Sequence, residues 1–360
     1  MKYLDEYLEY EQPTKYIVDS DIYDDSYEIP VLTAGQSFVL GYTNEKNNIF
    51  PENKLPVIIF DDFTTSTQFV NFPFKVKSSA MKILHSTDKA NIKYFYYFLK
   101  NIKINTETHK RYWISEFSKM EVPDISLEEQ NKIVAKLDLI NDSIELKKLM
   151  IKDIDNILLS QFYKMFNDIN NYELKTLKDC SNFIDYRGHT PLVTETGEIR
   201  MINAKSVGKG YFKYINEFIT KELYDSWMHR GIPNTGDILF VTEGHTFGNS
   251  CLIPEELDIF ALGQRVITIQ PNENLNNKYL WAYMQTKFFA DKINQFKTGG
   301  TAQGIRSKDL LKVTIPIPPK KLQEAYANFY DQLMLQKSSC KKDIEDLEKL
   351  LQLKINEYFN

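Results

Sequence analysis

The chain has 360 residues, of which 42% are hydrophobic and 26% charged, and its formal net charge is −5 at pH 7. These fractions are typical of a soluble globular protein, and the length allows two ordinary domains with connecting segments. They exclude a strongly basic nucleic-acid-binding protein, and no apolar run reaches the roughly 20 residues that a membrane-spanning helix needs.

The cysteines and the first residues indicate the compartment. Cys180, Cys251 and Cys340 are odd in number and far apart, which gives neither a disulfide framework nor a metal cluster. Residues 1–6 are acidic and lack the pattern of a signal peptide. We therefore expect a cytoplasmic protein, because a reducing compartment suits unpaired thiols.

The first globular segment begins with an acidic arm. Residues 1–28 hold two basic and nine acidic residues, a net charge of −7, and Pro13 interrupts any helix there. Residues 29–121 have a net charge of +4, from twelve basic and eight acidic residues. We expect strands at 29–32, 55–62, 74–77 and 80–84, a polar loop at 63–68, and an aromatic helix or buried segment at 92–99.

A long helical stretch follows, and the chain contains it twice. One offset of 193 aligns Pro123 with Pro316, Gln130 with Gln323 and Asn167 with Asn360. Proline blocks helix just before each stretch, so we predict helices over 126–167 and 319–360. Their apolar residues are mostly three, four or seven apart, which is typical of a coiled-coil seam. The seam residues that we single out are Ile140, Ile154, Leu158, Leu333, Leu347 and Leu351.

The second globular segment repeats the order of the first. Residues 201–204 parallel 31–34, residues 236–241 parallel the strand at 55–62, and residues 278–284 parallel 93–99. The loops differ much more than the helices do, and the net charge of 172–315 is only +1, from seventeen basic and sixteen acidic residues. We predict an α+β fold with two mixed α/β domains, at 1–122 and 168–315. Two long antiparallel coiled-coil helices, at 123–167 and 316–360, separate them in a pseudo-twofold internal repeat.

Motifs for catalysis are sparse. There is no Walker loop, and the five histidines have no metal-ligand spacing. Asn71-Phe72-Pro73-Phe74 is only distantly similar to an amino-methyltransferase motif, and no glycine-rich cofactor loop precedes it. Asp61 and Asp62 could bind Mg²⁺ as in a nuclease, although an acidic pair that caps a loop at a strand end is more common. We therefore expect no catalytic residue, metal or cofactor in this chain.

Polar loops rich in DNA-pairing side chains favour binding instead. Arg, Lys, Asn, Gln, Ser and Thr are the residue types that contact base edges and phosphates, although each also occurs in solvated loops. We expect Gln303 and His245 to contact base edges, and Lys205 and Lys297 to contact phosphates. The other candidates are Thr64, Thr65, His109, Lys110 and Arg111 in the first domain, and Arg187, His189, Lys209, Asn249, Thr301 and Arg306 in the second.

Several of these motifs together resemble the DNA-specificity subunit of type I restriction-modification systems. They are the proline-led helix starts at 122–130 and 315–323, residues 186–191 with 199–210, and residues 9–16 with 60–65. The first domain departs from the pattern because it lacks the Gly-x-Thr-Pro turn of residues 188–191. The first helix also starts with Asp124-Ile125-Ser126, where the second has Ile317-Pro318-Pro319.

The resemblance implies recognition of double-stranded DNA without catalysis. Each target-recognition domain would read one half of a split sequence in the major groove, and the helices would set the spacing. Two methyltransferase subunits, which carry S-adenosylmethionine, and restriction subunits would be the partners. A specificity module of a methylation-only or type II restriction-methylation enzyme, and a non-catalytic coiled-coil scaffold, are the alternatives. A stand-alone nuclease or methyltransferase is disfavoured by the missing cofactor motifs.

Overall fold

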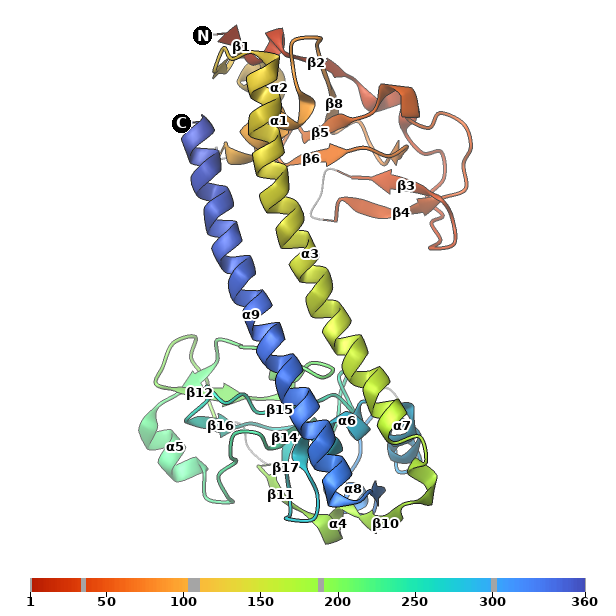
Figure 1. Cartoon of the computed structure of the whole chain (residues 1–360), viewed down its shortest axis with the longest axis vertical. Coiled ribbons are helices and arrows are strands. Elements are labelled where there is room, and N and C mark those ends of the chain that lie inside the picture. The colour runs from red at the N-terminus through yellow and green to blue at the C-terminus, as the bar shows by residue number, and fades with distance from the viewer. Residues whose placement is uncertain (1, 34–36, 103–110, 187–190, 299–302, 360) are drawn as a thin grey trace. The chain divides into compact units, whose positions relative to one another are not determined.

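The computed structural model describes residues 2–33, 37–102, 111–186, 191–298 and 303–359. The chain divides into two compact units, which we describe separately. The first unit comprises residues 1–148 and 342–360, and the second comprises residues 149–341. Each unit contains part of both long helices, α3 (Leu127–Met165) and α9 (Lys320–Phe359), and we call the rest of the unit its domain (Figure 1). Among the described residues, no helix is long and apolar enough to cross a membrane.

The first domain is built on a four-stranded antiparallel sheet in the order β2-β8-β5-β6 (Figure 1). A smaller sheet, β4-β3-β7, and the pair β1-β9 complete it. The strands are β1 (Lys2–Tyr3), β2 (Leu8–Glu11), β3 (Ile29–Leu32), β4 (Val39–Thr43), β5 (Val57–Asp61), β6 (Thr67–Val70), β7 (Lys75–Val76), β8 (Met81–Ser86) and β9 (Glu121–Val122). The helices of the domain are α1 (Ile92–Asn101) and α2 (Tyr112–Ser115).

Strand β5 is buried on both faces, and its side chains alternate between two cores. Ile58 and Phe60 pack with the aromatic side chains of α1. Val57 and Ile59 pack on the other face, in a cluster that includes Phe50. The central strand therefore holds the two layers of the domain together, and its C-terminal end carries the polar loop 63–66.

The second domain repeats this plan around β14 (Figure 1). Its main sheet has the order β11-β17-β14-β15, beside a sheet β13-β12-β16 and the pair β10-β18. The strands are β10 (Glu173–Thr176), β11 (Ser181–Asp185), β12 (Ile199–Ile202), β13 (Phe218–Ile219), β14 (Ile238–Val241), β15 (Ser250–Leu252), β16 (Phe260–Leu262), β17 (Val266–Pro271) and β18 (Thr314–Ile317). The helices are α4 (Leu177–Cys180), α5 (Lys221–Trp227), α6 (Asn277–Met284), α7 (Lys287–Asn294) and α8 (Ser307–Leu310).

The two central strands have matching registers. Asp61 pairs with Met81 in the first domain, and Val241 pairs with Val266 in the second. Strand β14 also alternates between two cores, because Ile238 and Phe240 face α6 while Leu239 and Val241 face β12 and β16. The internal repeat that the helices indicate in the sequence therefore extends to the sheets.

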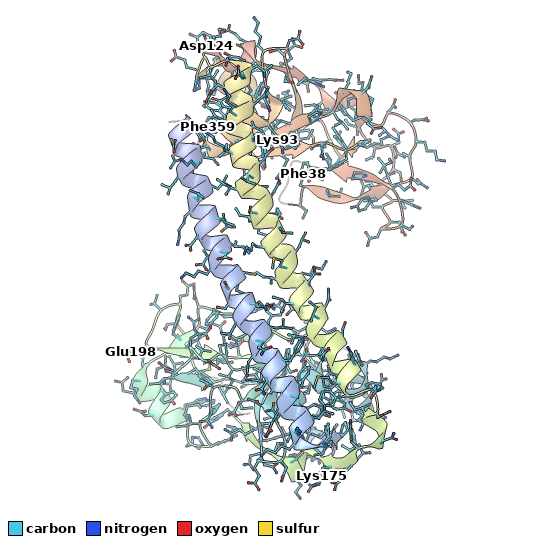
Figure 2. All side chains as sticks on the ribbon, viewed as in Figure 1. Phe38, Lys93, Asp124, Lys175, Glu198 and Phe359 are labelled. Atoms are coloured by element: carbon cyan, nitrogen blue, oxygen red, sulfur yellow. The ribbon has the colours of Figure 1, made fainter. Side chains whose placement is uncertain are left out.

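The long helices are α3 (Leu127–Met165, 39 residues) and α9 (Lys320–Phe359, 40 residues), and both predicted helices are confirmed. In the first unit, the start of α3 packs with the end of α9, which carries Phe359 (Figure 2). The ring of Phe359 also lies 5.0 Å from that of Tyr94 in α1. In the second unit, the end of α3 packs with the start of α9. Of the predicted seam residues, Ile154, Leu158 and Leu333 form a buried cluster there. Ile140, Leu347 and Leu351 are half-buried.

The repeated glutamine joins each helix to its domain. Gln130 is fully buried. Its Oε1 accepts from the backbone N–H of Asn91 at 2.8 Å, and its Nε2 donates to the backbone carbonyls of residues 89 and 125. Gln323 makes the same contacts with the Asn276 amide and the carbonyls of residues 274 and 318. Asn91 and Asn276 in turn cap α1 and α6. The sequence repeat thus includes a buried hydrogen-bond clamp in each unit.

The acidic arm contains strands that the sequence analysis did not anticipate. Strand β2 pairs with β8, and the Glu11 carboxylate at its end lies 3.2 Å from His85 Nε2, 2.8 Å from Lys15 Nζ and 3.1 Å from Lys54 Nζ. Burial raises the pKa of Glu11, but hydrogen bonds from Lys15, Tyr16 and Lys54 outweigh it and lower that pKa to about 2. Pro13 does not break a regular helix here, because it begins a short 3-10 helix.

Candidate nucleic-acid interface

Three segments lie side by side at the end of β14 in the second domain. The Thr242 amide donates to the Arg265 carbonyl at 2.9 Å, and the Ile305 amide donates to the Thr242 carbonyl at 2.9 Å. One step further along, the Gly244 amide donates to the Gln303 carbonyl at 3.0 Å. We call the segments 242–249, 263–265 and 303–306 the second-domain edge. The two predicted reading loops, 242–249 and 297–306, are therefore joined by backbone hydrogen bonds.

Glycine is required where these loops meet. A Cβ at Gly304 would lie 2.9 Å from the Glu243 Cβ, which is closer than real Cβ contacts come, and 3.0 Å from the Thr242 carbonyl oxygen, which is tighter than most. Gly304 also exchanges two backbone hydrogen bonds with Thr298, at 2.9 and 3.0 Å. The predicted loop is thus closed at its base and fixed against the end of a core strand.

Exposed polar side chains project from this edge. His245, Gln303 and Arg306 are exposed, and Lys297 is half-buried with its Nζ 5.8 Å from the centre of the Phe247 ring. The structure therefore brings together four residues that the sequence predicts as DNA contacts. Amide, imidazole and cationic groups on one edge can donate to base acceptors and to phosphate oxygens.

Sequence reasoning missed two charged residues of this edge, Arg265 and Glu243. Arg265 Nε lies 2.9 Å from Glu243 Oε1, and both side chains are more than half exposed. Arg265 also adopts a left-handed backbone conformation, with φ of 66°. The signal available in the sequence was the short polar turn Gly263-Gln264-Arg265 between two apolar strands, but only the fold places it next to Glu243.

The first domain has an edge of the same construction, formed by segments 62–66, 80 and 111–113. The Asp62 amide donates to the Ala80 carbonyl at 3.3 Å, and the Tyr112 amide donates to the Asp62 carbonyl at 3.0 Å. These bonds match those around Thr242. Of the predicted residues, Thr64 and Thr65 lie in the turn that the Thr65 amide closes on the Asp61 carbonyl at 3.0 Å, and the Arg111 guanidinium lies 6.0 Å from the ring of the turn residue Phe63. The fold therefore brings together three predicted residues here.

The acidic pair at this edge has a local structural role. Asp61 accepts hydrogen bonds from the Phe63 amide at 2.9 Å and from Thr64 Oγ1 at 2.5 Å. Asp62 accepts from the Trp113 amide at 2.9 Å and lies 3.4 Å from the buried Lys82 ammonium. Both carboxylates are buried and hold the turn and α2 in place, as a loop-capping pair does. No cluster of three metal-ligating side chains occurs among residues 2–33, 37–102, 111–186, 191–298 and 303–359.

Other predicted residues lie elsewhere or outside the described residues. Lys205 Nζ lies 2.6 Å from Glu217 Oε1. Lys209 lines a cavity of about 400 Å³ beside α3 and α6. The Asn249 amide nitrogen donates to the Val207 carbonyl at 3.3 Å, so it fixes a neighbouring turn. His109, Lys110, Arg187, His189 and Thr301 fall outside the part of the chain that the structure describes.

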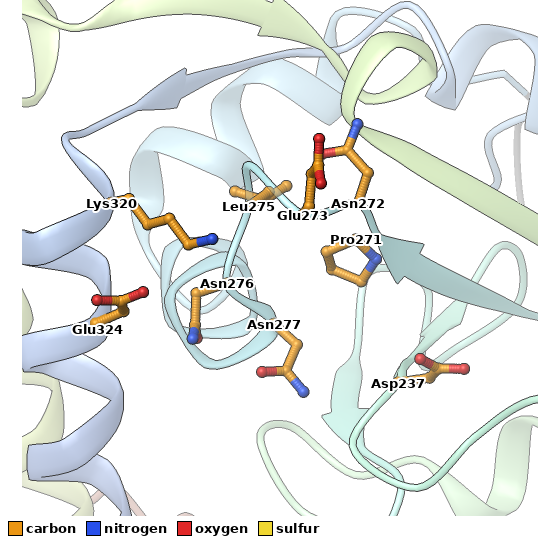
Figure 3. A pocket seen from close by; sticks show the side chains of 9 residues that line it. All are labelled: Asp237, Pro271, Asn272, Glu273, Leu275, Asn276, Asn277, Lys320 and Glu324. Atoms are coloured by element: carbon orange, nitrogen blue, oxygen red, sulfur yellow. The ribbon is translucent and has the colours of Figure 1, made fainter.

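A cavity of about 260 Å³ lies where α9 meets the second domain (Figure 3). Lys320 and Glu324 of α9, Asn276 and Asn277 of α6, and Asp237 line it. Burial raises the pKa of Asp237 above its ordinary value, and the hydrogen bonds from residues 234 and 270, which lower this pKa, only partly offset the effect. The first unit has a cavity of about 370 Å³ at the equivalent place, lined by residues that include 91, 127 and 131. Both cavities adjoin a glutamine clamp, so they mark the joints of the repeat.

Comparison with known proteins agrees with this architecture. The family described as the type I restriction modification DNA specificity domain matches residues 169–349. The chain is 34% identical over 353 residues to the type I restriction enzyme EcoR124I/EcoR124II specificity subunit of Escherichia coli, covering 91% of this chain and 85% of that protein.

Two solved structures share the fold. The S subunit of the type I restriction-modification system from M. genitalium aligns with a TM-score of 0.58 at 15% identity, over 100% of this chain and 95% of that one. A chain from a study of complex assembly and conformational transition in the type I R-M system aligns with a TM-score of 0.53 at 15% identity, over 99% and 96%. The family model that matches half of the chain and the relative that is 34% identical establish that the chain belongs to the DNA specificity subunits of type I restriction-modification systems.

Proposed function

We propose that each domain reads one half of a split target in double-stranded DNA, through the edge described above. The observation that carries this proposal is that one backbone arrangement occurs twice with different side chains. Ala80 in the first domain corresponds to Arg265 in the second, and Arg111 corresponds to Gly304. A shared scaffold with different exposed groups suits two readers of different sequences, because base-edge patterns are distinguished by the donors and acceptors that face them.

The chain supplies recognition, and its partners supply chemistry. Methylation would be carried out by two methyltransferase subunits that bind S-adenosylmethionine, and restriction subunits would join them for cleavage. The acidic pair Asp61-Asp62, the strongest catalytic candidate in the sequence, already binds the protein's own amide and hydroxyl groups. Partner subunits that enclose the DNA would also provide phosphate-neutralising charge, which this chain, with a net charge of −5, has little of.

The long helices would set the distance between the half-targets and provide docking surfaces for the methyltransferase subunits. A helix rises about 1.5 Å per residue, so the 39 residues of α3 extend roughly 58 Å. DNA rises about 3.4 Å per base pair along each strand, so a rigid helix of this length spans more than one turn of the duplex. The number of base pairs between the half-targets would then depend on helix length.

A domain exchange tests the assignment of one domain to one half-target. Residues 172–315 are replaced by the corresponding domain of a relative, and methylated adenines are mapped in DNA from cells that make the complex. We expect one half of the recognised sequence to change and the other half to stay as it was. The matched control exchanges residues 1–121 and should change only the other half. If either chimera altered both halves, the two domains would not read independently.

A further inference from the structure

We propose that Arg265 determines part of the DNA specificity of the second domain by reading a guanine, and that Glu243 positions it. This inference rests on the proposed function, and it assigns a base-reading role to a residue outside the loops that the sequence singles out. Arginine that pairs with guanine O6 and N7 is the commonest specific contact in the major groove, because its fork of donors matches the two acceptors.

The backbone presents Arg265 at the edge in a defined way. Its carbonyl accepts from the Thr242 amide at 2.9 Å, which extends the β14–β17 ladder by one pair beyond Val241 and Val266. Its φ of 66° lies in the left-handed region, which bulky residues seldom adopt. Because such conformations are costly and gather at functional sites, their presence on an exposed turn supports a functional role for the side chain.

Glu243 holds the guanidinium on one side. The ion pair joins Arg265 Nε to Glu243 Oε1 at 2.9 Å, with exposed side-chain fractions of 58% and 52%. An ion pair this exposed contributes little to stability. Its effect is on orientation, since a contact at Nε directs the two terminal nitrogens toward a bidentate acceptor. The position of Glu243 is itself fixed, because its Cβ packs against Gly304 and the amide of the next residue, Gly244, donates a hydrogen bond to the Gln303 carbonyl.

The internal repeat makes the Arg265 position a place where the two readers differ. Its equivalent is Ala80, whose carbonyl accepts the corresponding hydrogen bond from Asp62 at 3.3 Å. The same backbone bond therefore forms with either side chain, so the scaffold does not require an arginine. Phe63 similarly corresponds to Glu243, which gives the first domain neither member of the ion pair. The two domains therefore share this backbone arrangement, but only the second-domain edge carries the two charged groups.

The test uses the specificity subunit assembled with its methyltransferase subunits, on the target found by methylation mapping. Duplexes in which each G·C pair of the second half-target is replaced in turn by A·T are compared for affinity. We expect the affinity of the wild-type complex to fall about 5- to 150-fold when one such pair is replaced, as for the loss of a bidentate base contact. Arg265→Ala should bind the intact target more weakly by the same factor and no longer discriminate at that one pair.

Three further variants separate base reading from charge. Arg265→Lys keeps the charge but loses the fork, so discrimination at the same pair should fall while the salt dependence stays unchanged. Glu243→Ala should reduce discrimination at that pair only, since it removes the side chain whose Oε1 contacts Arg265 Nε. Lys221→Ala, which removes another exposed ion pair, with Asp225, from the same domain, is the control and should bind as wild type does.

Several outcomes would overturn the proposal. Discrimination by Arg265→Ala that matches wild type at every pair would exclude base reading by this residue, as would a second half-target without any G·C pair. A uniform loss on all duplexes, with the salt slope lowered by about one unit and rescue by lysine, would assign Arg265 to a phosphate. A wild-type complex that showed no sequence preference would instead refute the proposed function itself.

Discussion

The buried glutamine clamp allows a quantitative prediction for Gln323→Leu. The change removes one acceptor and two donors from a fully buried position while nearly preserving side-chain volume. It leaves the amide of Asn276 and the carbonyls of residues 274 and 318 without their partner. A buried group that loses its hydrogen bond costs about 1–3 kcal/mol, and only the bond to residue 318 is completely buried. Because water can reach the other two groups, we expect a loss of about 2–5 kcal/mol in the free energy of unfolding.

Urea unfolding of the full chain measures the size of this loss, and amide hydrogen exchange locates it. Since Asn276 caps α6, protection should fall over Asn277–Met284 in the second unit and stay unchanged over Ile92–Asn101 in the first. Gln332→Leu, an exposed site on the same helix, is the matched control and should stay within about 0.5 kcal/mol of wild type. If Gln323→Leu were equally neutral, the clamp would not be a stabilising element, and its repetition in the sequence would need another cause.

Three other predictions concern the helices, the acidic arm and the reading edge. Ile154→Asp combined with Leu333→Asp should abolish complex assembly in size-exclusion chromatography, because each change buries a charge in the apolar cluster that these two side chains form with Leu158; normal assembly would contradict the seam. The pKa of Glu11 is lowered from 4.5 to about 2, so its stabilisation is present above pH 4.5 and lost as the pH falls toward 2. Glu11→Gln should therefore flatten the pH dependence of the melting temperature in that range, and an unchanged profile would exclude this contribution. Gln303→Ala should relax one base-pair preference at a cost of about 1–3 kcal/mol, whereas Lys297→Ala should weaken binding to target and scrambled duplexes alike and lower the salt slope by about one unit. Neither loop residue contacts DNA if both variants bind as wild type does.

The features that the sequence predicted well are those set by neighbouring residues. Proline before each long helix, the seam spacing and the shared offset of Gln130 and Gln323 are local signals, and they located α3 and α9 to within a few residues. The polarity of loops 242–249 and 297–306 also identified candidate reading segments. These signals depend on spacing along the chain, which a sequence records directly.

The features that the sequence did not predict depend on partners far away in the chain. Strand β2 forms by pairing with β8, more than seventy residues later, and its alternation of Glu9 and Glu11 with apolar residues is short. Arg265 lies in a three-residue turn without periodicity, and only the pairing of β14 with β17 brings it to Glu243. Lys205 and Asn249 have suitable chemistry for DNA, but the fold provides each with a protein partner.

The strand pairs at the base of each domain affect how the sequence of the chain can evolve. In the second unit, β10 runs antiparallel to β18 and Glu173 pairs with Ile317, so the polypeptide enters and leaves the domain at one place. In the first unit, Lys2 pairs with Val122 in the same way. Each domain is thus joined to the rest of the chain through a single pair of strands, which we call its stem. Insertions or deletions elsewhere in the domain do not move this stem. Genetic exchange between two crossover points in the stem could replace the whole reader without redesign of the helices. A new DNA target would then be acquired in one step rather than through a series of weakened intermediates.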